Sequence, residues 1–155
     1  MLIMLRLPIT IIALTLVGAT LPAFAEKKAI GNNAGRPFSQ GIVFGDTLYV
    51  AGMTGNKDGK IPDNFEEEVK QTLENIGAVL KESGFSFADA VSLQVYLTDM
   101  ELFGRMNTVY MKYFPEPRPT RTTVGVAKLV GTAKIEITVT ARNDAFGGKA
   151  KKKKK

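Results

Sequence analysis

Two segments of the sequence repeat apolar residues at the spacing of a helix, and each segment does so on one side only. The first set is Phe65, Val69, Leu73, Ile76 and Leu80. The second set is Leu102, Phe103, Met106, Val109, Tyr110 and Tyr113. A helix with a single apolar side is stable only when that side is buried against another layer. The pattern therefore predicts two helices that cover one face of a common sheet.

Residues that are common at the start or the end of a helix flank both segments. Asp63, with Glu66 three residues later, has the pattern of a capping box and predicts the start of the first helix. Gly84 suits the left-handed residue that ends it. Asp99 is predicted to cap the second helix, and the prolines from Pro115 onward end helical structure there.

Five segments around the helices have the apolar alternation or the β-branched composition of strands. They are Gln40–Phe44, Thr47–Met53, Val91–Thr98, Arg121–Ala127 and Ala133–Ala141. Gly45 and Asp46 join the first two segments, which predicts a hairpin. The polar, Gly- and Asn-rich stretch Glu26–Gly35 is expected to be extended or loose. The element order is therefore β-β-α-β-α-β-β, which is typical of an α+β fold.

The predicted sheet face away from the helices has a mixed composition. It combines small polar, aromatic and charged side chains, namely Ser92, Gln94, Tyr96, Glu136, Thr138 and Thr140. One interpretation is an antiparallel sheet face in contact with water. The other is a face buried against further subunits. The residue pattern alone leaves both interpretations open.

The first 25 residues have the features of a cleavable secretory signal. Arg6 gives a positive start, Leu7–Leu16 is an uncharged apolar run, and Ala23-Phe24-Ala25 is a small-x-small cleavage site. The alternative is a retained membrane anchor, but the apolar run is short for a span of about 20 residues. We therefore expect residues 1–25 to be removed after Ala25, and residues 26–148 to form one domain in the periplasm or outside the cell.

The formal net charge of +6 is concentrated at the C-terminus, where Lys149 and Lys151–Lys155 form a basic tail over residues 149–155. The rest of the mature chain is almost neutral. A run of like charges repels itself, so residues 149–155 are predicted to be disordered. The second interpretation is a weak electrostatic contact of this tail with an anionic surface.

The sequence contains neither cysteine nor histidine. This absence excludes disulfides, thiolate nucleophiles, the Ser-His-Asp triad and the usual zinc sites. Acid–base chemistry would have to come from Asp, Glu, Lys, Tyr or a bound water. An all-oxygen metal site is the alternative, but the D-x-D-x-D-G pattern of a calcium loop does not occur, so the sequence predicts no metal site.

Three polar residues are candidates for a binding or catalytic role. Arg121 follows a proline-rich segment at the start of a strand, and its planar guanidinium can hold a carboxylate through two parallel hydrogen bonds. Glu136 lies mid-strand, where β propensity disfavours it; in an enclosed site its carboxylate could serve as a general base. Asn107 lies within the second helix. Each residue also has a structural alternative. Arg121 would be an ordinary surface residue, and Glu136 an edge-strand charge that discourages aggregation. Asn107 would lie on the helix surface or make a buried hydrogen bond.

Short motifs along the chain occur in the order and spacing of one known family. They are Arg36-Pro37-Phe38-Ser39-Gln40, Tyr49-Val50-Ala51-Gly52, Gln71-Thr72 through Asn75-Ile76 to Ala78-Val79-Leu80, Tyr96-Leu97-Thr98-Asp99-Met100, Asn107-Thr108-Val109-Tyr110 with Tyr113-Phe114, Arg118-Pro119-Thr120-Arg121-Thr122-Thr123-Val124, and Lys134-Ile135-Glu136-Ile137. On these motifs the chain resembles the RidA (YjgF-like) family from about Ala29 to Arg142, which is nearly the whole domain.

The resemblance implies a fold, an assembly and a reaction. RidA-like proteins are chorismate-mutase-like α+β domains with a mixed sheet and two helices on one face. They form homotrimers whose sheets enclose a central barrel, with one ligand cleft at each subunit interface. They hydrolyse reactive 2-imino acids, such as 2-iminobutanoate and 2-iminopropanoate, to 2-keto acids and ammonia without a cofactor. The mixed sheet face would then be buried in the trimer.

The family's functional positions fall on matching residues of this sequence. The arginine that clamps the substrate carboxylate corresponds to Arg121, and the glutamate thought to position the attacking water corresponds to Glu136. The cleft asparagine corresponds to Asn107, and the glycine that lines the pocket corresponds to Gly52. By resemblance, these residues would bind a small 2-imino acid or a related carboxylate.

The chain departs from the family at several polar positions of the cleft. Phe38 stands where tyrosine is usual, and Ala51 stands where serine is usual. Thr123 replaces a common cysteine, and Gly125 replaces a glutamate. Phe38 and Thr123 are still expected to contact the substrate, and the lost polar groups are expected to affect the choice of substrate.

Two other functions are alternatives to an imine deaminase. A non-catalytic trimer that binds a small carboxylate or shields unfolded proteins would need Arg121 but would not depend on Glu136. A nucleic-acid-directed role, including the ribonuclease activity attributed to some relatives, is supported only by the basic tail, because the neutral body lacks a basic stripe with interleaved aromatics. Binding through the tail would weaken steeply with added salt.

Overall fold

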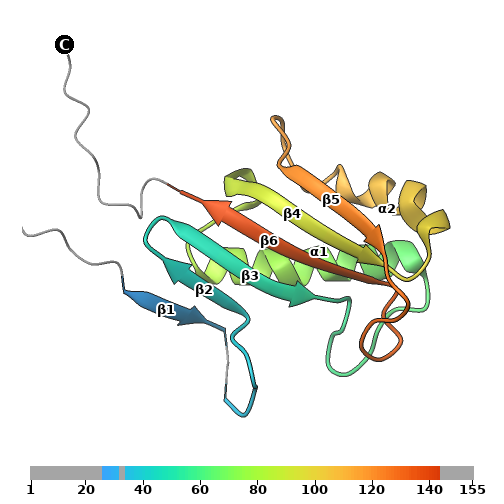
Figure 1. The fold of residues 1–155 in the computed structure, drawn as a ribbon, viewed down its shortest axis with the longest axis horizontal. Helices are drawn as coiled ribbons and strands as arrows, with labels where there is room; N and C mark the ends of the chain where they lie inside the picture. The colour runs from blue at the N-terminus through green and yellow to red at the C-terminus, as the bar shows by residue number, and fades with distance from the viewer. Residues whose placement is uncertain (1–25, 32–33, 144–155) are drawn as a thin grey trace, which may run out of the picture.

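The computed structural model describes residues 26–31 and 34–143. The predicted signal segment 1–25 and the basic tail 149–155 lie outside the described residues. The described chain contains a six-stranded sheet in the order β1-β2-β3-β6-β4-β5 (Figure 1). The strands are β1 (Lys27–Ile30), β2 (Gly41–Phe44), β3 (Thr47–Met53), β4 (Ala90–Leu97), β5 (Thr120–Gly125) and β6 (Ile135–Arg142). The helices are α1 (Phe65–Glu82) and α2 (Phe103–Tyr110), with 3₁₀ turns η1 (Phe87–Asp89) and η2 (Met100–Leu102).

The sheet is mixed, because β4 and β5 run parallel while the other neighbouring strands run antiparallel. Figure 1 shows α1 and α2 on the same side of the sheet, behind it in this view. This architecture confirms the predicted α+β fold with two helices on one face. The predicted hairpin is β2–β3, in which Phe44 is opposite Thr47 and Gly45 adopts a positive φ.

The hydrophobic core lies between the sheet and the apolar sides of the two helices. Leu73 and Ile76 of α1 and Met106 of α2 have no exposed surface. Val95 of β4 and Ile137 of β6 are equally buried and lie opposite each other in the sheet. The two helical apolar sets therefore meet one sheet face, as their spacing predicts.

The stretch Glu26–Gly35 was expected to be extended or loose; it is extended over Lys27–Ile30, which form an edge strand, β1, that was not predicted as a strand. This strand pairs antiparallel with β2, from Lys27 opposite Phe44 to Ile30 opposite Gly41. Only Ile30 is buried, and the other residues of β1 are exposed. A strand with one buried residue shows no apolar alternation, so no local pattern predicts it. It forms because it pairs with the otherwise free edge of β2.

The start of the first helix also differs from the prediction, by one residue. Asn64 rather than Asp63 is the N-cap, and its side-chain oxygen accepts a hydrogen bond from the Glu67 N–H at 3.0 Å. Asp99 caps the η2 turn that precedes α2, accepting from the Glu101 N–H at 2.9 Å. Gly84 follows the end of α1 with φ of 79°, as predicted.

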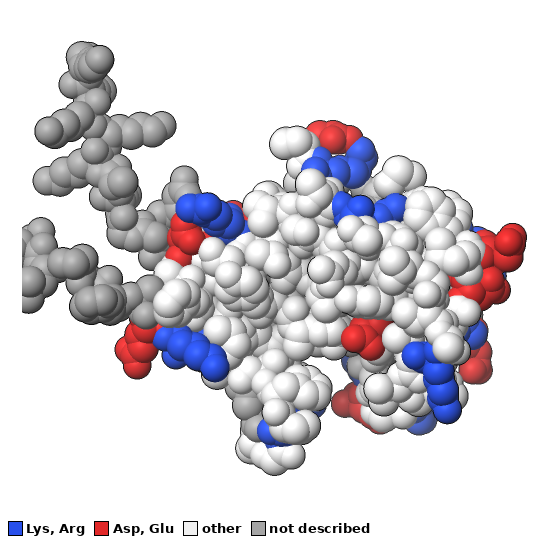
Figure 2. Space-filling model, viewed as in Figure 1, with Lys and Arg blue, Asp and Glu red and all other residues white. Residues whose placement is uncertain are grey.

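The sheet face opposite the helices is the one that Figure 2 presents. Its middle is largely uncharged, and most lysine, arginine, aspartate and glutamate side chains in this view gather around the rim. A shallow depression of about 210 Å³ lies on the central strands, where Tyr49, Gln94 and Thr140 contribute to its lining. Within the described residues, no helix is both long enough and apolar enough to cross a membrane.

Candidate active site

Glu136 lies on β6 directly over the backbone of β3. The pairing of β3 with β6 shifts register between Val50 and Met53, and Gly52 lies within this irregular stretch. A Cβ atom built on Gly52 would overlap the carboxylate of Glu136. Glycine is therefore required here by close approach rather than by backbone angle, and it lets the carboxylate lie against the β3 backbone.

The Glu136 carboxylate is left available by its surroundings. The residue is half-buried, and its side chain makes no hydrogen bond or ion pair with the described part of the chain. It opens into a cavity of about 660 Å³, which Gly52 and Phe38 also line. The structure thus places three of the residues carried over by resemblance around one cavity.

Arg121 lies on the edge strand β5 and points to the helix side of the sheet. Its guanidinium lies over the ring of Tyr110, 4.6 Å from the centroid, and 5.3 Å from the ring centroid of Phe103. Burial raises the pKa of Tyr110, and the charge of Arg121 partly offsets that rise. No ion pair of Arg121 occurs among the described residues, so the aromatic rings hold a cation that no carboxylate of the described chain neutralises.

Two further residues carried over by resemblance, Asn107 and Thr123, lie on the same side of the sheet as Arg121. Together with Arg121 they form a second group, separate from the first group of Glu136, Gly52 and Phe38. Asn107 is half-buried on α2, between Phe103 and Tyr110 at helical spacings of four and three residues, so it shares their side of the helix. Its side chain has no hydrogen bond within the described residues. Thr123 follows Arg121 on the same side of β5, and its hydroxyl is buried without a partner in the described structure.

The sheet register separates the two groups within one chain. Tyr96 of β4 pairs with Glu136, and both lie on the open sheet face. Leu93, the residue three positions before Tyr96, is buried on the helix side and pairs with Arg121. Because adjacent strand residues point to opposite faces, Arg121 and Glu136 lie on opposite sides of the sheet.

Several residues of these sites were not predicted as functional. Phe103 and Tyr110 were assigned to the apolar helix side, and only the folded structure shows that their rings contact Arg121. Asn75 donates hydrogen bonds from its amide to the carbonyl oxygens of Thr54 and Asn56, both at 2.9 Å. It thereby fixes the loop that follows β3 at the cavity wall. Its place in a family motif was the available signal.

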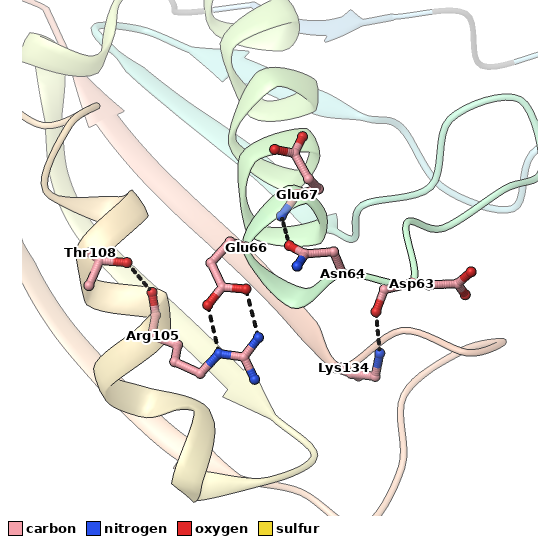
Figure 3. A network of polar contacts seen from close by, with 7 residues as sticks. All are labelled: Asp63, Asn64, Glu66, Glu67, Arg105, Thr108 and Lys134. Carbon is pink, nitrogen blue, oxygen red and sulfur yellow. Dashed lines mark hydrogen bonds and ion pairs between the residues drawn. The ribbon is translucent and has the colours of Figure 1, made fainter.

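Separate polar contacts join α1 to α2 and join the residue before β6 to the segment before α1 (Figure 3). Arg105 of α2 forms two hydrogen bonds of 2.6 Å with the carboxylate of Glu66 at the start of α1. This contact lowers the pKa of Glu66 to about 2. Lys134 donates from its Nζ to the carbonyl oxygen of Asp63 at 3.2 Å. The charges of Glu66 and Arg105 are matched to each other, so we assign this pair a structural role.

Comparison with known proteins gives a consistent picture. Residues 27–143 match the family model described as endoribonuclease L-PSP. A RutC family protein of Saccharolobus solfataricus is 43% identical over 77% of this chain and 94% of its own length. The mouse 2-iminobutanoate/2-iminopropanoate deaminase is 34% identical over 71% of this chain and 84% of its own length.

Solved structures agree with these sequence matches. The crystal structure of E. coli TdcF with bound serine superposes with a TM-score of 0.71 and 31% identity, covering 76% of this chain and 99% of that one. RidA from an Antarctic Psychrobacter gives 0.71 and 30% identity over 75% of this chain and 99% of that one. This chain therefore belongs to the endoribonuclease L-PSP family, the family of the RidA and YjgF proteins.

Proposed function

We propose that this protein hydrolyses reactive 2-imino acids to 2-keto acids and ammonia. The supporting observation is the unpaired carboxylate of Glu136, which lies against Gly52 and opens into a cavity. A carboxylate in that setting can accept a proton from water. Relatives named as reactive intermediate deaminase in Arabidopsis and as 2-iminobutanoate/2-iminopropanoate deaminase in mouse support the same chemistry.

The reaction needs little beyond orientation and one base. A protonated imine carbon is already electrophilic, so water adds to it once the two are held together. Glu136 would take a proton from that water as the C–O bond forms. Glu136 would return this proton to the nitrogen of the resulting carbinolamine, and the C–N bond would then break as ammonia leaves with its electron pair. As the C=O bond forms, the hydroxyl proton passes to Glu136 and on to ammonia, so the products are the keto acid and ammonium. The base would supply a factor on the order of 10²–10⁴.

The substrate carboxylate would be held by Arg121 through two parallel hydrogen bonds. Because Arg121 and Glu136 lie on opposite sides of the sheet in one chain, we propose that a site combines Glu136 of one copy with Arg121 of a neighbouring copy. Such a site fits the homotrimer implied by the family resemblance. The largely uncharged open face (Figure 2) would then line the centre of the trimer.

A competition assay tests the proposed reaction. An amino-acid oxidase generates an imine from leucine or methionine, and semicarbazide traps whatever imine is not hydrolysed. The protein without residues 1–25 is expected to suppress trapping. Arg121→Ala and Glu136→Gln are each expected to reduce that suppression by about 100-fold or more.

Matched substitutions outside the two groups serve as controls. Arg142, which pairs with Asp46 at 2.7 Å, and the exposed Glu101 are suitable positions. Arg142→Ala and Glu101→Gln should leave the suppression unchanged. Wild-type protein that never suppresses trapping, across imines of several amino acids, would overturn the deaminase proposal and favour a carboxylate-binding trimer.

The export of the protein is proposed from residues 1–25 alone. Their signal-like pattern predicts cleavage after Ala25 and a periplasmic or secreted mature chain. A ribonuclease function receives less support. The whole sequence lacks histidine, so a nuclease here would need a different general base.

A further inference from the structure

The carboxylate of Glu68 is buried in the fold, outside the cavity that contains Glu136. Glu68 belongs to α1, has no exposed surface and is not among the described residues that line that cavity. A charged side chain is rarely buried completely unless specific partners hold it there. The contacts of Glu68 therefore indicate its role.

One oxygen of this carboxylate binds the chain just before Glu136. Its Oε1 accepts hydrogen bonds from the backbone N–H groups of Lys134 at 2.6 Å and Ile135 at 3.3 Å. The side chain of Lys134 also donates to the carbonyl oxygen of Asp63, before α1, at 3.2 Å (Figure 3). The two residues that precede Glu136 are therefore held by α1 and by the segment before it.

The same side chain packs against the loop that follows β3. A Cβ atom built on Gly55 would lie 2.8 Å from the Cγ atom of Glu68 and 2.8 Å from its carbonyl oxygen. Gly55 is buried, and the lack of a Cβ lets the loop and α1 approach this closely. Glu68 thus contacts both the segment that follows Gly52 and the segment that precedes Glu136.

These contacts lie beyond the end of the pairing between β3 and β6. That pairing stops at Met53 opposite Ile137, after the register shift that follows Val50. Glu136 lies between this last pair and the two residues that Glu68 binds. The backbone before Glu136 is therefore held by its pairing with β4 and by the Glu68 side chain, without a strand pair from β3.

We propose that Glu68 is a positioning residue: by binding the backbone just before Glu136, it sets where that carboxylate lies over Gly52. This inference rests on the proposed deaminase function. A misplacement of about 1 Å can cost on the order of 100-fold in rate. The effect should fall on kcat rather than on KM, because Glu68 acts through the base, whereas the substrate carboxylate is held by Arg121 of another copy.

Changing the length and the polarity of this side chain tests the role. Glu68→Asp keeps the carboxylate but is shorter by one methylene, and Glu68→Leu removes both oxygens. Semicarbazide competition at several imine concentrations gives kcat and KM. We expect each variant to lower kcat by about tenfold and to leave KM within about twofold. Glu68→Gln keeps an acceptor of the same length for the two N–H groups, so its kcat should stay within about twofold of wild type.

A change at a neighbouring buried position controls for lost stability. Thr72, one turn further along α1, is as buried as Glu68, and its hydroxyl donates to the Glu68 carbonyl oxygen at 2.8 Å. Thr72→Val removes this hydrogen bond and leaves the Glu68 carboxylate in place. It should lower the free energy of unfolding in urea while kcat stays as in wild type. If Glu68→Leu does not fold, Glu68→Asp is the variant compared with it.

Three results would overturn the positioning role. They are wild-type kcat in Glu68→Asp, a change in KM rather than in kcat, and an equal loss of kcat in Thr72→Val. If wild-type protein hydrolyses no imine, the deaminase proposal fails, and crystal structures of wild type and Glu68→Asp decide the positioning role. A Glu136 carboxylate displaced from Gly52 by about 1 Å or more would support it, and an unmoved carboxylate would overturn it.

Discussion

At the scale of single residues, the site depends on one close approach between two strands. Gly52 has no Cβ, and the space that a Cβ would need is occupied by the carboxylate of Glu136. The side chain of Glu136 can therefore lie flat on β3 while its oxygens face the cavity. Neither residue would serve the proposed reaction in this geometry without the other.

Gly52→Ala should therefore impair catalysis more than folding. The added methyl group must displace the Glu136 carboxylate, and we expect kcat/KM in the semicarbazide competition assay to fall by roughly 100-fold. Gly104→Ala on α2 is the control, because a Cβ there meets no atom within 4 Å; it should keep full activity. Wild-type activity in Gly52→Ala would show that the position of Glu136 is unimportant.

The sequence predicted which residues are candidates for the site, but it did not predict on which face of the sheet each one lies. Glu136 was recognisable as a carboxylate within an apolar strand, and Arg121 as an arginine at a strand start. That they face opposite sides of the sheet follows from the pairing of β4 with both β5 and β6. A local sequence pattern does not predict which distant strands pair. The placement of Arg121 and Glu136 on opposite sides of the sheet therefore became evident only in the folded chain.

At the scale of elements, a buried carboxylate joins α1 to the start of β6. Glu68 of α1 has no exposed surface, and its Oε1 accepts from the backbone N–H groups of Lys134 at 2.6 Å and Ile135 at 3.3 Å. Its Oε2 has no partner among the described residues. Burial raises the pKa of Glu68, although the two N–H donors act in the opposite direction.

This raised pKa makes the stability of the fold depend on pH. The folded protein binds the Glu68 proton more tightly than the unfolded chain, whose glutamate pKa is near 4.5. The associated stabilisation is complete below that pH and is lost as pH rises through the folded-state pKa. Glu68→Gln cannot ionise, so its free energy of unfolding relative to wild type should be higher at pH 8 than at pH 5.

Urea unfolding at the two pH values measures this difference. Glu67→Gln, the neighbouring position on the exposed side of α1, is the matched control and should shift the free energy of unfolding equally at both. A Glu68→Gln difference that does not change between pH 5 and pH 8 would mean that Glu68 is not the titrating group.

Element boundaries were predictable where local signals were strong. The long apolar side of α1 predicted that helix, and Gly84, which is left-handed in the structure, predicted its end. The predicted N-cap of α1 was wrong by one residue, because Asp63 and Asn64 are both good N-cap residues. In the structure the helix begins after Asn64. β1 was missed because Ile30 is its single buried residue, which is too little for any alternation to show.

At the scale of the whole molecule, the proposed assembly rests on the open sheet face and on the separation of Arg121 from Glu136. One chain holds Glu136 on the open face and Arg121 on the helix side of an edge strand. A cyclic oligomer with head-to-tail interfaces brings unlike surfaces of identical chains together around a ring. The central claim is that each active site joins Glu136 of one copy to Arg121 of the next.

Mixing two inactive variants tests that claim most directly. Arg121→Ala and Glu136→Gln are combined in equal amounts, dissociated, reassembled and assayed by semicarbazide competition. If sites form between copies of a trimer, random assortment should restore roughly a quarter of wild-type activity, because some interfaces then pair an intact Glu136 with an intact Arg121. Mixed trimers that form, as seen by mass measurement, yet remain inactive would contradict the account.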